Sequence, residues 1–196
     1  MARVRLRPLP AVLAATLIAS VVAGYLISRT DGDDGEQVRM DAPGTYPEPP
    51  GGIPTAPELV GDALPDLSVR TVDGDEVTLA SLTGQPLVVN LWFSTCVPCK
   101  KELPDFAEVH REIGDEVRFV GLNLQDSPER AMRFAEQAGV GFEILLDSEQ
   151  AVAVALDIAR FPSTLFVEPS GRIVELHQGE LTAPELRALI DEELLG

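Results

Sequence analysis

Cysteine and histidine are scarce in this chain: of its 196 residues only Cys96 and Cys99 are cysteines, and only two are histidines. A structural zinc site needs about four ligands, and His110 and His177 lie far apart in the sequence, so no metal site is expected. A c-type haem site would need a histidine directly after the second cysteine, where Lys100 stands. A disulfide across so short a loop would remove little entropy from the unfolded chain and would be a weak staple. The pattern Cys-Val-Pro-Cys therefore predicts thiol–disulfide exchange, without a metal or other cofactor.

Positive charge is scarce as well. Lys and Arg together number 15 against 32 Asp and Glu, which gives a formal net charge of -17. A chain of that sign is a poor ligand for phosphates, so nucleic acid is excluded as an expected partner. The only two lysines, Lys100 and Lys101, directly follow the second cysteine, and we expect them to be solvated.

The N-terminal segment contains the one long apolar run of the sequence. Residues 9–28 carry no charge and are long enough to span the hydrocarbon core of a bilayer. Arginines precede the run and acidic residues follow it, which predicts a cytoplasmic N-terminus and an external remainder. We expect residues 1–28 to be a single-pass signal-anchor in the cell membrane, with secretion after signal-peptide cleavage as the alternative. Either topology places the rest of the chain where disulfides form and persist.

The next segment has a different composition. Residues 29–57 contain six prolines, five glycines and six acidic residues, and offer little apolar surface to bury. We therefore expect a disordered linker, followed by one folded domain over residues 58–196.

Within that domain, strand patterns alternate with helix patterns. The predicted strands are 67–72 and 76–79, which flank the hairpin signal Asp73-Gly74, and 87–93, 117–124, 142–146, 164–167 and 173–177. The predicted helices are 97–113, one that begins after Ser127, 149–156, and a last one that begins with the capping box Thr182 and Glu185. This order predicts an α/β fold with a mixed central sheet flanked by helices.

The two cysteines lie at a junction between two of these elements. The apolar run 87–93 reads as a buried strand, and the helix over 97–113 begins between Cys96 and Cys99. The N-terminus of a helix has unpaired N–H groups and the positive end of the dipole, both of which stabilise a thiolate. The location thus supports exchange chemistry.

Residues 91–104, Leu-Trp-Phe-Ser-Thr-Cys-Val-Pro-Cys-Lys-Lys-Glu-Leu-Pro, resemble the active-site segment of the thioredoxin superfamily. Within it, the chain is most similar to the membrane-anchored, extracytoplasmic TlpA/ResA-like thiol–disulfide oxidoreductases. The segment 161–164, Phe-Pro-Ser-Thr before a strand, resembles the cis-proline segment of that family, and Gly179 follows the last strand. Residues 126–160 resemble its βα insertion. The likeness covers residues 59–195 and implies a thioredoxin-like fold with an N-terminal β-hairpin.

The resemblance also implies roles for individual residues. Cys96 would be the exposed nucleophile and Cys99 the resolving thiol, and together they would form the redox-active disulfide. Glu102 fits the Cys-x-x-Cys-x-x-Glu pattern and would transfer the proton of the resolving thiol, because Asn90 replaces the buried aspartate of cytosolic thioredoxin. A carboxylate half-buried beneath two thiols would have a raised pKa.

The remaining implied roles concern substrate contact. Phe161, Pro162 and Trp92 would contribute to substrate binding, with the backbone before Pro162 pairing with the substrate chain. The family usually has an aromatic residue directly before the first cysteine, where this chain has Thr95, which removes an apolar contact surface beside the site.

The activity that the resemblance implies is the reduction of disulfides in exported proteins, for example apocytochrome c during cytochrome c maturation. Its electrons would come from a membrane thiol donor of the CcdA/DsbD type, and we expect a monomer. An oxidase or isomerase of the same fold runs the exchange in reverse and is an alternative. A redoxin-type thiol peroxidase is another alternative. A peroxidatic cysteine typically has Thr or Ser three residues earlier, whereas here Phe93 holds that position for Cys96 and Cys96 holds it for Cys99. A Cu(I) carrier is the third, since two thiolates suit Cu(I).

Overall fold

The computed structural model describes residues 59–196. The predicted signal-anchor, residues 1–28, and the predicted linker, residues 29–57, lie outside the described residues. Among residues 59–196, no helix has the length and apolar character needed to span a bilayer.

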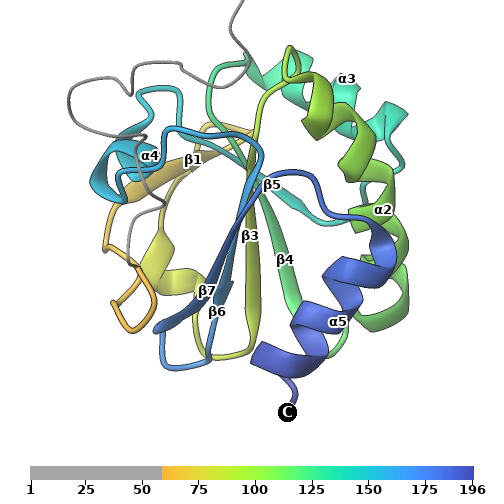
Figure 1. The fold of residues 1–196 in the computed structure, drawn as a ribbon. Coiled ribbons are helices and arrows are strands. Elements are labelled where there is room, and N and C mark those ends of the chain that lie inside the picture. Colours follow the sequence, from red (N-terminus) through yellow and green to blue (C-terminus); the bar gives the residue numbers. More distant parts are fainter. Residues whose placement is uncertain (1–58) are drawn as a thin grey trace, which may run out of the picture. The chain divides into compact units, whose positions relative to one another are not determined.

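A seven-stranded sheet forms the centre of the domain (Figure 1). The strands are β1 (Ser68–Thr71), β2 (Glu76–Thr78), β3 (Leu87–Trp92), β4 (Arg118–Asn123), β5 (Glu143–Leu146), β6 (Ser163–Val167) and β7 (Ile173–Gln178). Their order is β2-β1-β5-β4-β3-β6-β7. Strands β3, β4 and β5 run parallel, whereas β1 and β2 on one side and β6 and β7 on the other are antiparallel to their neighbours. The prediction of a mixed sheet is confirmed.

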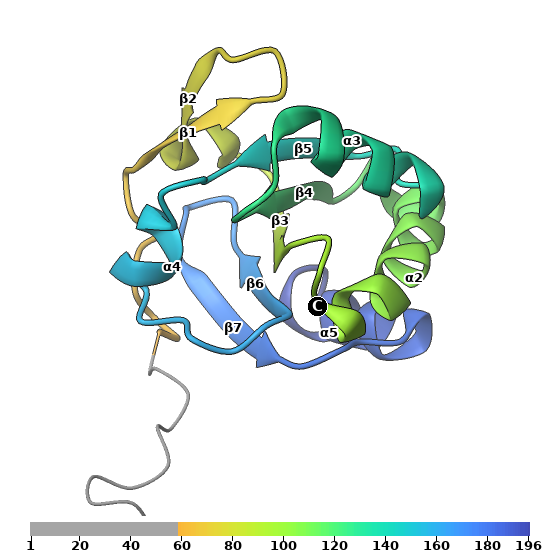
Figure 2. The same cartoon turned by 90° about the horizontal axis from the view of Figure 1, so that it is seen from above.

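Helices cover both faces of this sheet (Figure 2). The helical elements are the 3-10 helix η1 (Leu79–Leu82) and the α-helices α2 (Val97–Ile113), α3 (Pro128–Gln137), α4 (Ala151–Ala155) and α5 (Ala183–Glu193). Helices α2, α3 and α5 pack on one face, and η1 and α4 on the other, each against its own apolar cluster.

Strand β3 explains how the two layers share one sheet. All six of its residues are buried, and successive side chains point to opposite faces. Val89 and Leu91 belong to the cluster under η1 and α4, whereas Val88 and Trp92 belong to the cluster under α2. A sheet covered on both faces requires a strand that is apolar on both sides, and β3 meets this requirement except at Asn90.

All the predicted helices and strands are present, with ends that differ by one to a few residues. Helix α4 begins at Ala151 rather than 149, where the Asp147 carboxylate accepts hydrogen bonds from the N–H groups of Ala151 and Val152 at 2.9 and 2.8 Å. The element that the sequence pattern did not predict is η1, whose Leu79 and Leu82 are both buried.

Gly121 in β4 marks a close approach on the α2 face of the sheet. A Cβ atom there would lie 2.7 Å from Ile144 Cδ1 and 2.9 Å from Trp92 Nε1. We expect Gly121→Ala to lower the free energy of unfolding by roughly 1–3 kcal/mol, because extra volume in a packed core forces neighbours out of place. Urea unfolding of the oxidised protein measures this. Gly141→Ala is the matched control, since its Cβ would meet nothing closer than 3.9 Å, and equal losses in both variants would contradict the argument.

Candidate active site

The two cysteines form a disulfide at the start of α2. Their Cα atoms are 5.3 Å apart, and Cys96 is the N-cap residue of the helix. The Cys96 sulfur accepts a hydrogen bond from the Cys99 N–H at 3.3 Å. The first turn of α2 contains no acidic side chain that would compete for the helix N–H groups. The site therefore contains a disulfide that two electrons can reduce, at a position where the helix N-terminus stabilises a thiolate.

The accessibility of the dithiol differs from the prediction. Cys96 was expected to be exposed but is only 7% exposed, and Cys99 is fully buried. In the disulfide, Cys96 belongs to the apolar cluster beneath α2, which explains its low exposure. The residue that stands out from the surface is Val97, at 65% exposed. An exposed apolar side chain thus lies directly beside the nearly buried Cys96 sulfur.

Glu102 is buried more completely than the sequence pattern predicted. It is 1% exposed rather than half-buried, and it lies three residues beyond Cys99 on α2. Burial raises the pKa of Glu102 to about 7, despite hydrogen bonds from Asn90 and Leu181 that lower it. Asn90 Nδ2 donates to Glu102 Oε1 at 2.8 Å, and the Leu181 N–H donates to Glu102 Oε2 at 3.2 Å. A carboxyl group of this kind can exchange a proton near neutral pH.

Asn90 is the partner of Glu102 that sequence reasoning considered only for its inability to titrate. It is 1% exposed in the middle of β3, and its Nδ2 also donates to Thr164 Oγ1 at 3.2 Å. Among residues 59–196 its Oδ1 has no hydrogen-bond partner. The amide therefore orients the carboxylate and links it to β6. A polar residue on the α2-facing side of an otherwise apolar strand was the available signal.

The segment from Phe161 to Pro162 lies next to the dithiol segment. Their peptide bond is cis, as the resemblance implied. The Phe161 ring meets the Phe93 ring edge to face with centroids 5.7 Å apart, and Phe93 stands three residues before Cys96. Phe161 is partly buried. The structure thus brings together two segments that are about 65 residues apart in the sequence.

The expected place of Trp92 is corrected by the structure. Its side chain is fully buried and stacks on Phe134 with ring centroids 5.4 Å apart. It points to the α2 face of β3, so it supports the site from within the core and does not offer a surface for substrate.

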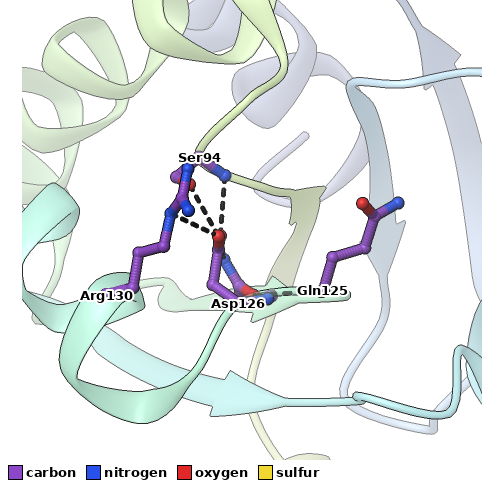
Figure 3. Close-up of polar contacts among 5 residues, drawn as sticks. Ser94, Gln125, Asp126 and Arg130 are labelled. Atoms are coloured by element: carbon purple, nitrogen blue, oxygen red, sulfur yellow. Dashed lines mark hydrogen bonds and ion pairs between the residues drawn. The ribbon is translucent and has the colours of Figure 1, made fainter.

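A group of polar side chains that sequence reasoning missed surrounds Asp126 next to the dithiol segment. The group consists of Ser94, Asp126 and Arg130, which are labelled in Figure 3, together with Asn123. Ser94 and Asn123 follow or end the neighbouring parallel strands β3 and β4, whose carboxyl ends meet at the same edge of the sheet. Polar residues just after two buried parallel strands could have indicated the cluster. Across residues 59–196, no group of three or more His, Cys, Asp and Glu side chains is placed to hold a metal.

A redox-active disulfide at the N-terminus of a helix, after a central strand and beside a cis-proline segment, defines a thiol–disulfide oxidoreductase of thioredoxin-like fold. The chain belongs to the AhpC/TSA family, whose sequence model matches residues 60–176.

Individual relatives agree with this assignment. The chain is similar to the thiol-disulfide oxidoreductase ResA of Bacillus subtilis, at 29% identity over 123 residues, which cover 62% of this chain and 69% of ResA. ResA of Oceanobacillus iheyensis is 30% identical over 138 residues, which cover 68% of this chain and 72% of that protein. Among solved structures, DsbF of MTB, in mixed oxidized and reduced forms, superposes with a TM-score of 0.60 at 27% identity, covering 65% of this chain and 94% of DsbF. A putative thiol:disulfide interchange protein DsbE from Chlorobium tepidum superposes with a TM-score of 0.63 at 24% identity, covering 70% of this chain and 98% of that one, and confirms the fold.

Proposed function

We propose that this protein is an extracytoplasmic reductase of disulfides in exported proteins. The observation that carries the proposal is the Cys96–Cys99 disulfide across the first turn of α2, with the buried Glu102 one turn further along the same helix. Together they supply an attacking sulfur, a resolving sulfur and a proton acceptor in one short segment.

The reaction begins from the reduced dithiol. The Cys96 thiolate attacks one sulfur of the substrate disulfide, so that a mixed disulfide forms and the other substrate sulfur leaves as a thiolate. Glu102 takes the proton of the Cys99 thiol, and the resulting thiolate attacks the Cys96 sulfur. The second substrate thiolate leaves, the substrate has gained two electrons, and the enzyme is left with the Cys96–Cys99 disulfide.

Substrate contact involves three apolar side chains around the dithiol. Val97 is exposed, and Phe93 and Phe161 are partly buried and in contact with each other. An extended substrate segment would lie over these side chains and pair with the backbone before Pro162. Because Thr95 replaces an aromatic residue, the contact surface is smaller on the side of the first cysteine, which favours a different set of substrates.

The setting of the reaction follows from the sequence outside the described residues. Residues 1–28 would anchor the protein with its domain outside the cytoplasm, and residues 29–57 would hold the domain off the membrane. In a secreted form, cleavage would release the same domain. Similarity to ResA proteins supports exchange with protein substrates, among which apocytochrome c is a candidate. A membrane thiol donor of the CcdA/DsbD type would restore the dithiol of the monomer.

The reduction potential of the Cys96–Cys99 pair tests the direction of this reaction. We expect a value below roughly -200 mV, in the range of thioredoxins and glutaredoxins, from equilibration in glutathione and dithiothreitol buffers followed by thiol trapping. A value near about -120 mV, that of a strong oxidant, would replace the reductase with an oxidase running the same exchange in reverse.

A further inference from the structure

Asp126 is a buried carboxylate at the edge of the sheet where β3 and β4 end. Its side chain is 6% exposed, and it lies in the loop between β4 and α3. Burying a charge is costly unless hydrogen bonds and an opposite charge compensate it. The structure supplies both kinds of compensation, and two of the hydrogen bonds come from Ser94, in the segment that leads to Cys96.

The two oxygens of Asp126 accept hydrogen bonds from Ser94 and Asn123, and one of them forms an ion pair with Arg130. Oδ2 accepts from the backbone N–H of Ser94 at 2.7 Å and from Asn123 Nδ2 at 2.8 Å. Oδ1 accepts from the Ser94 hydroxyl at 2.6 Å and is 3.0 Å from Arg130 Nε. Burial alone would raise the pKa of Asp126, but the hydrogen bonds from Ser94 and Asn123 and the charge of Arg130 outweigh it and hold the pKa below its usual value. The carboxylate is therefore charged and fully partnered.

Further hydrogen bonds that involve Asn123 and Arg130 stabilise the same network. Asn123 Oδ1 accepts the N–H groups of Asp126 at 2.9 Å and Gln125 at 3.2 Å, so the loop folds back on the end of β4. Arg130 Nε also donates to the Ser94 hydroxyl at 2.6 Å. Figure 3 shows Arg130 and Ser94 converging on Asp126, whereas the Gln125 side chain points away from them.

Ser94 is two residues before the first cysteine, in the turn that connects β3 to α2. Within this turn the Cys96 N–H donates to the Phe93 carbonyl at 3.1 Å. The backbone on both sides of Ser94 is therefore fixed, on one side by β3 and on the other by the start of α2. Asp126 binds the N–H of Ser94, which lies between these two elements.

We propose that Asp126 is a positioning residue for disulfide exchange: by binding the backbone and hydroxyl of Ser94, it keeps the Cys96 sulfur at the N-terminus of α2. The stabilisation of a thiolate by a helix end falls off within the first turn, so a small displacement of the sulfur weakens it. Asp126 is the first residue of the insertion over residues 126–160. Its contact with Ser94 therefore connects the insertion to the segment that carries Cys96. The inference rests on the proposed function of Cys96 as the attacking thiol.

The test is the rate at which iodoacetamide alkylates Cys96 in the reduced protein, followed by mass spectrometry across a range of pH. For Asp126→Asn we expect the rate at pH 7 to fall by roughly fivefold and the midpoint of the pH–rate profile to rise, because less of the sulfur is thiolate. A carboxylate that acted only through its negative charge would have the opposite effect, since its removal would favour the thiolate. An unchanged or faster rate in the folded variant would therefore overturn the proposal.

Asp147→Asn is the matched control. Asp147 is also a buried carboxylate with two backbone N–H donors, but its donors belong to α4 on the other face of the sheet. Its alkylation rate should stay within about twofold of the wild-type rate. A loss as large as that of Asp126→Asn would show a general effect of lost stability and would overturn the proposal.

Ser94→Ala provides a second variant should Asp126→Asn fail to fold. It removes the 2.6 Å hydroxyl bond but keeps the backbone bond to Asp126, so a smaller slowing in the same direction is expected, and no slowing would count against the proposal. The wild-type measurement separates the proposed function of Cys96 from the proposed role of Asp126. If Cys96 of the wild-type protein is no more reactive than Cys99, the proposed function fails. If wild-type Cys96 is the more reactive thiol but the variants are alkylated at the wild-type rate, this inference alone fails.

Discussion

Cys96→Ser should reduce the rate of insulin reduction to that of dithiothreitol alone, whereas Cys99→Ser should complete the first attack and then stop. The reason is the different position of the two sulfurs. Cys96 caps α2 and lies beside the exposed Val97, while Cys99 is fully buried one turn into the helix. A buried thiol cannot reach an external disulfide, so its loss leaves the mixed disulfide unresolved. Insulin turbidity measures turnover, and non-reducing mass spectrometry measures the trapped mixed disulfide.

The two serine variants serve as controls for each other, since each removes one sulfur from the same short segment. A mixed disulfide that accumulates in Cys96→Ser instead of Cys99→Ser would reverse the assigned roles. Residual turnover in Cys96→Ser above the dithiothreitol background would mean that another group performs the attack.

The different roles of two identical side chains come from the helix between them. Cys96 lies outside the first turn and can accept from its N–H groups, as it does from Cys99 at 3.3 Å. Cys99 lies inside the turn and is surrounded by core residues, where a charge is costly unless a neighbour takes up the proton. The fold therefore needs a proton acceptor on the buried side only, which is where Glu102 lies.

Local sequence patterns were sufficient for most elements of this fold. The capping box at the start of α5 is present, with the Glu185 carboxylate accepting from the N–H and hydroxyl of Thr182 at 2.9 and 2.6 Å. The apolar run of β3 is buried along its whole length. Strand order was beyond such patterns: β1 pairs with β5 as well as with β2, and no short-range signal specifies a partner that far along the chain.

The site shows the same division between local and long-range information. The dithiol, its helix and Glu102 lie within one short segment, so their spacing could be interpreted directly. Glu102 accepts a hydrogen bond from the N–H of Leu181, which is 79 residues away, and Ser94 donates to Asp126, which is 32 residues away. Such contacts arise from packing of the whole domain. Trp92 shows the converse, since a residue to which the resemblance gave a role in substrate binding lies in the core.

Because the pKa of Glu102 is raised in the folded protein, its ionisation lowers the free energy of unfolding as the pH rises toward neutral. Its pKa is about 7 in the folded protein against 4.5 for the ordinary group, so between these values the folded state holds a proton that the unfolded state has lost. Stability is then fully present below pH 4.5, falls as the pH rises, and levels off above about 7. At roughly 1.4 kcal/mol per pKa unit, the loss is on the order of 3 kcal/mol.

Glu102→Gln should remove this pH dependence from the oxidised protein, in which the cysteines are paired and do not titrate. The free energy of unfolding of the variant, relative to the wild type, should rise by about 3 kcal/mol between pH 4.5 and pH 8. Urea unfolding at several pH values measures the difference. Glu108→Gln, which changes an exposed glutamate on the same helix, is the control and should show a flat difference. A flat difference for Glu102→Gln as well would mean that Glu102 titrates as an ordinary carboxyl group.

The same substitution should slow turnover, because the variant cannot accept the proton of Cys99. General acid–base catalysis contributes about 10²-fold or more, so a loss of roughly that size is expected at pH 7. The deficit should shrink toward pH 9, where hydroxide in solution can take the proton that Glu102 otherwise accepts from Cys99. Alkylation of Cys96 should change little, since Glu102 acts on the other sulfur, and this separates proton transfer from general damage to the site. Turnover of Glu102→Gln equal to that of Glu108→Gln at pH 7 would remove Glu102 from the mechanism and leave its buried carboxylate as a feature of packing alone.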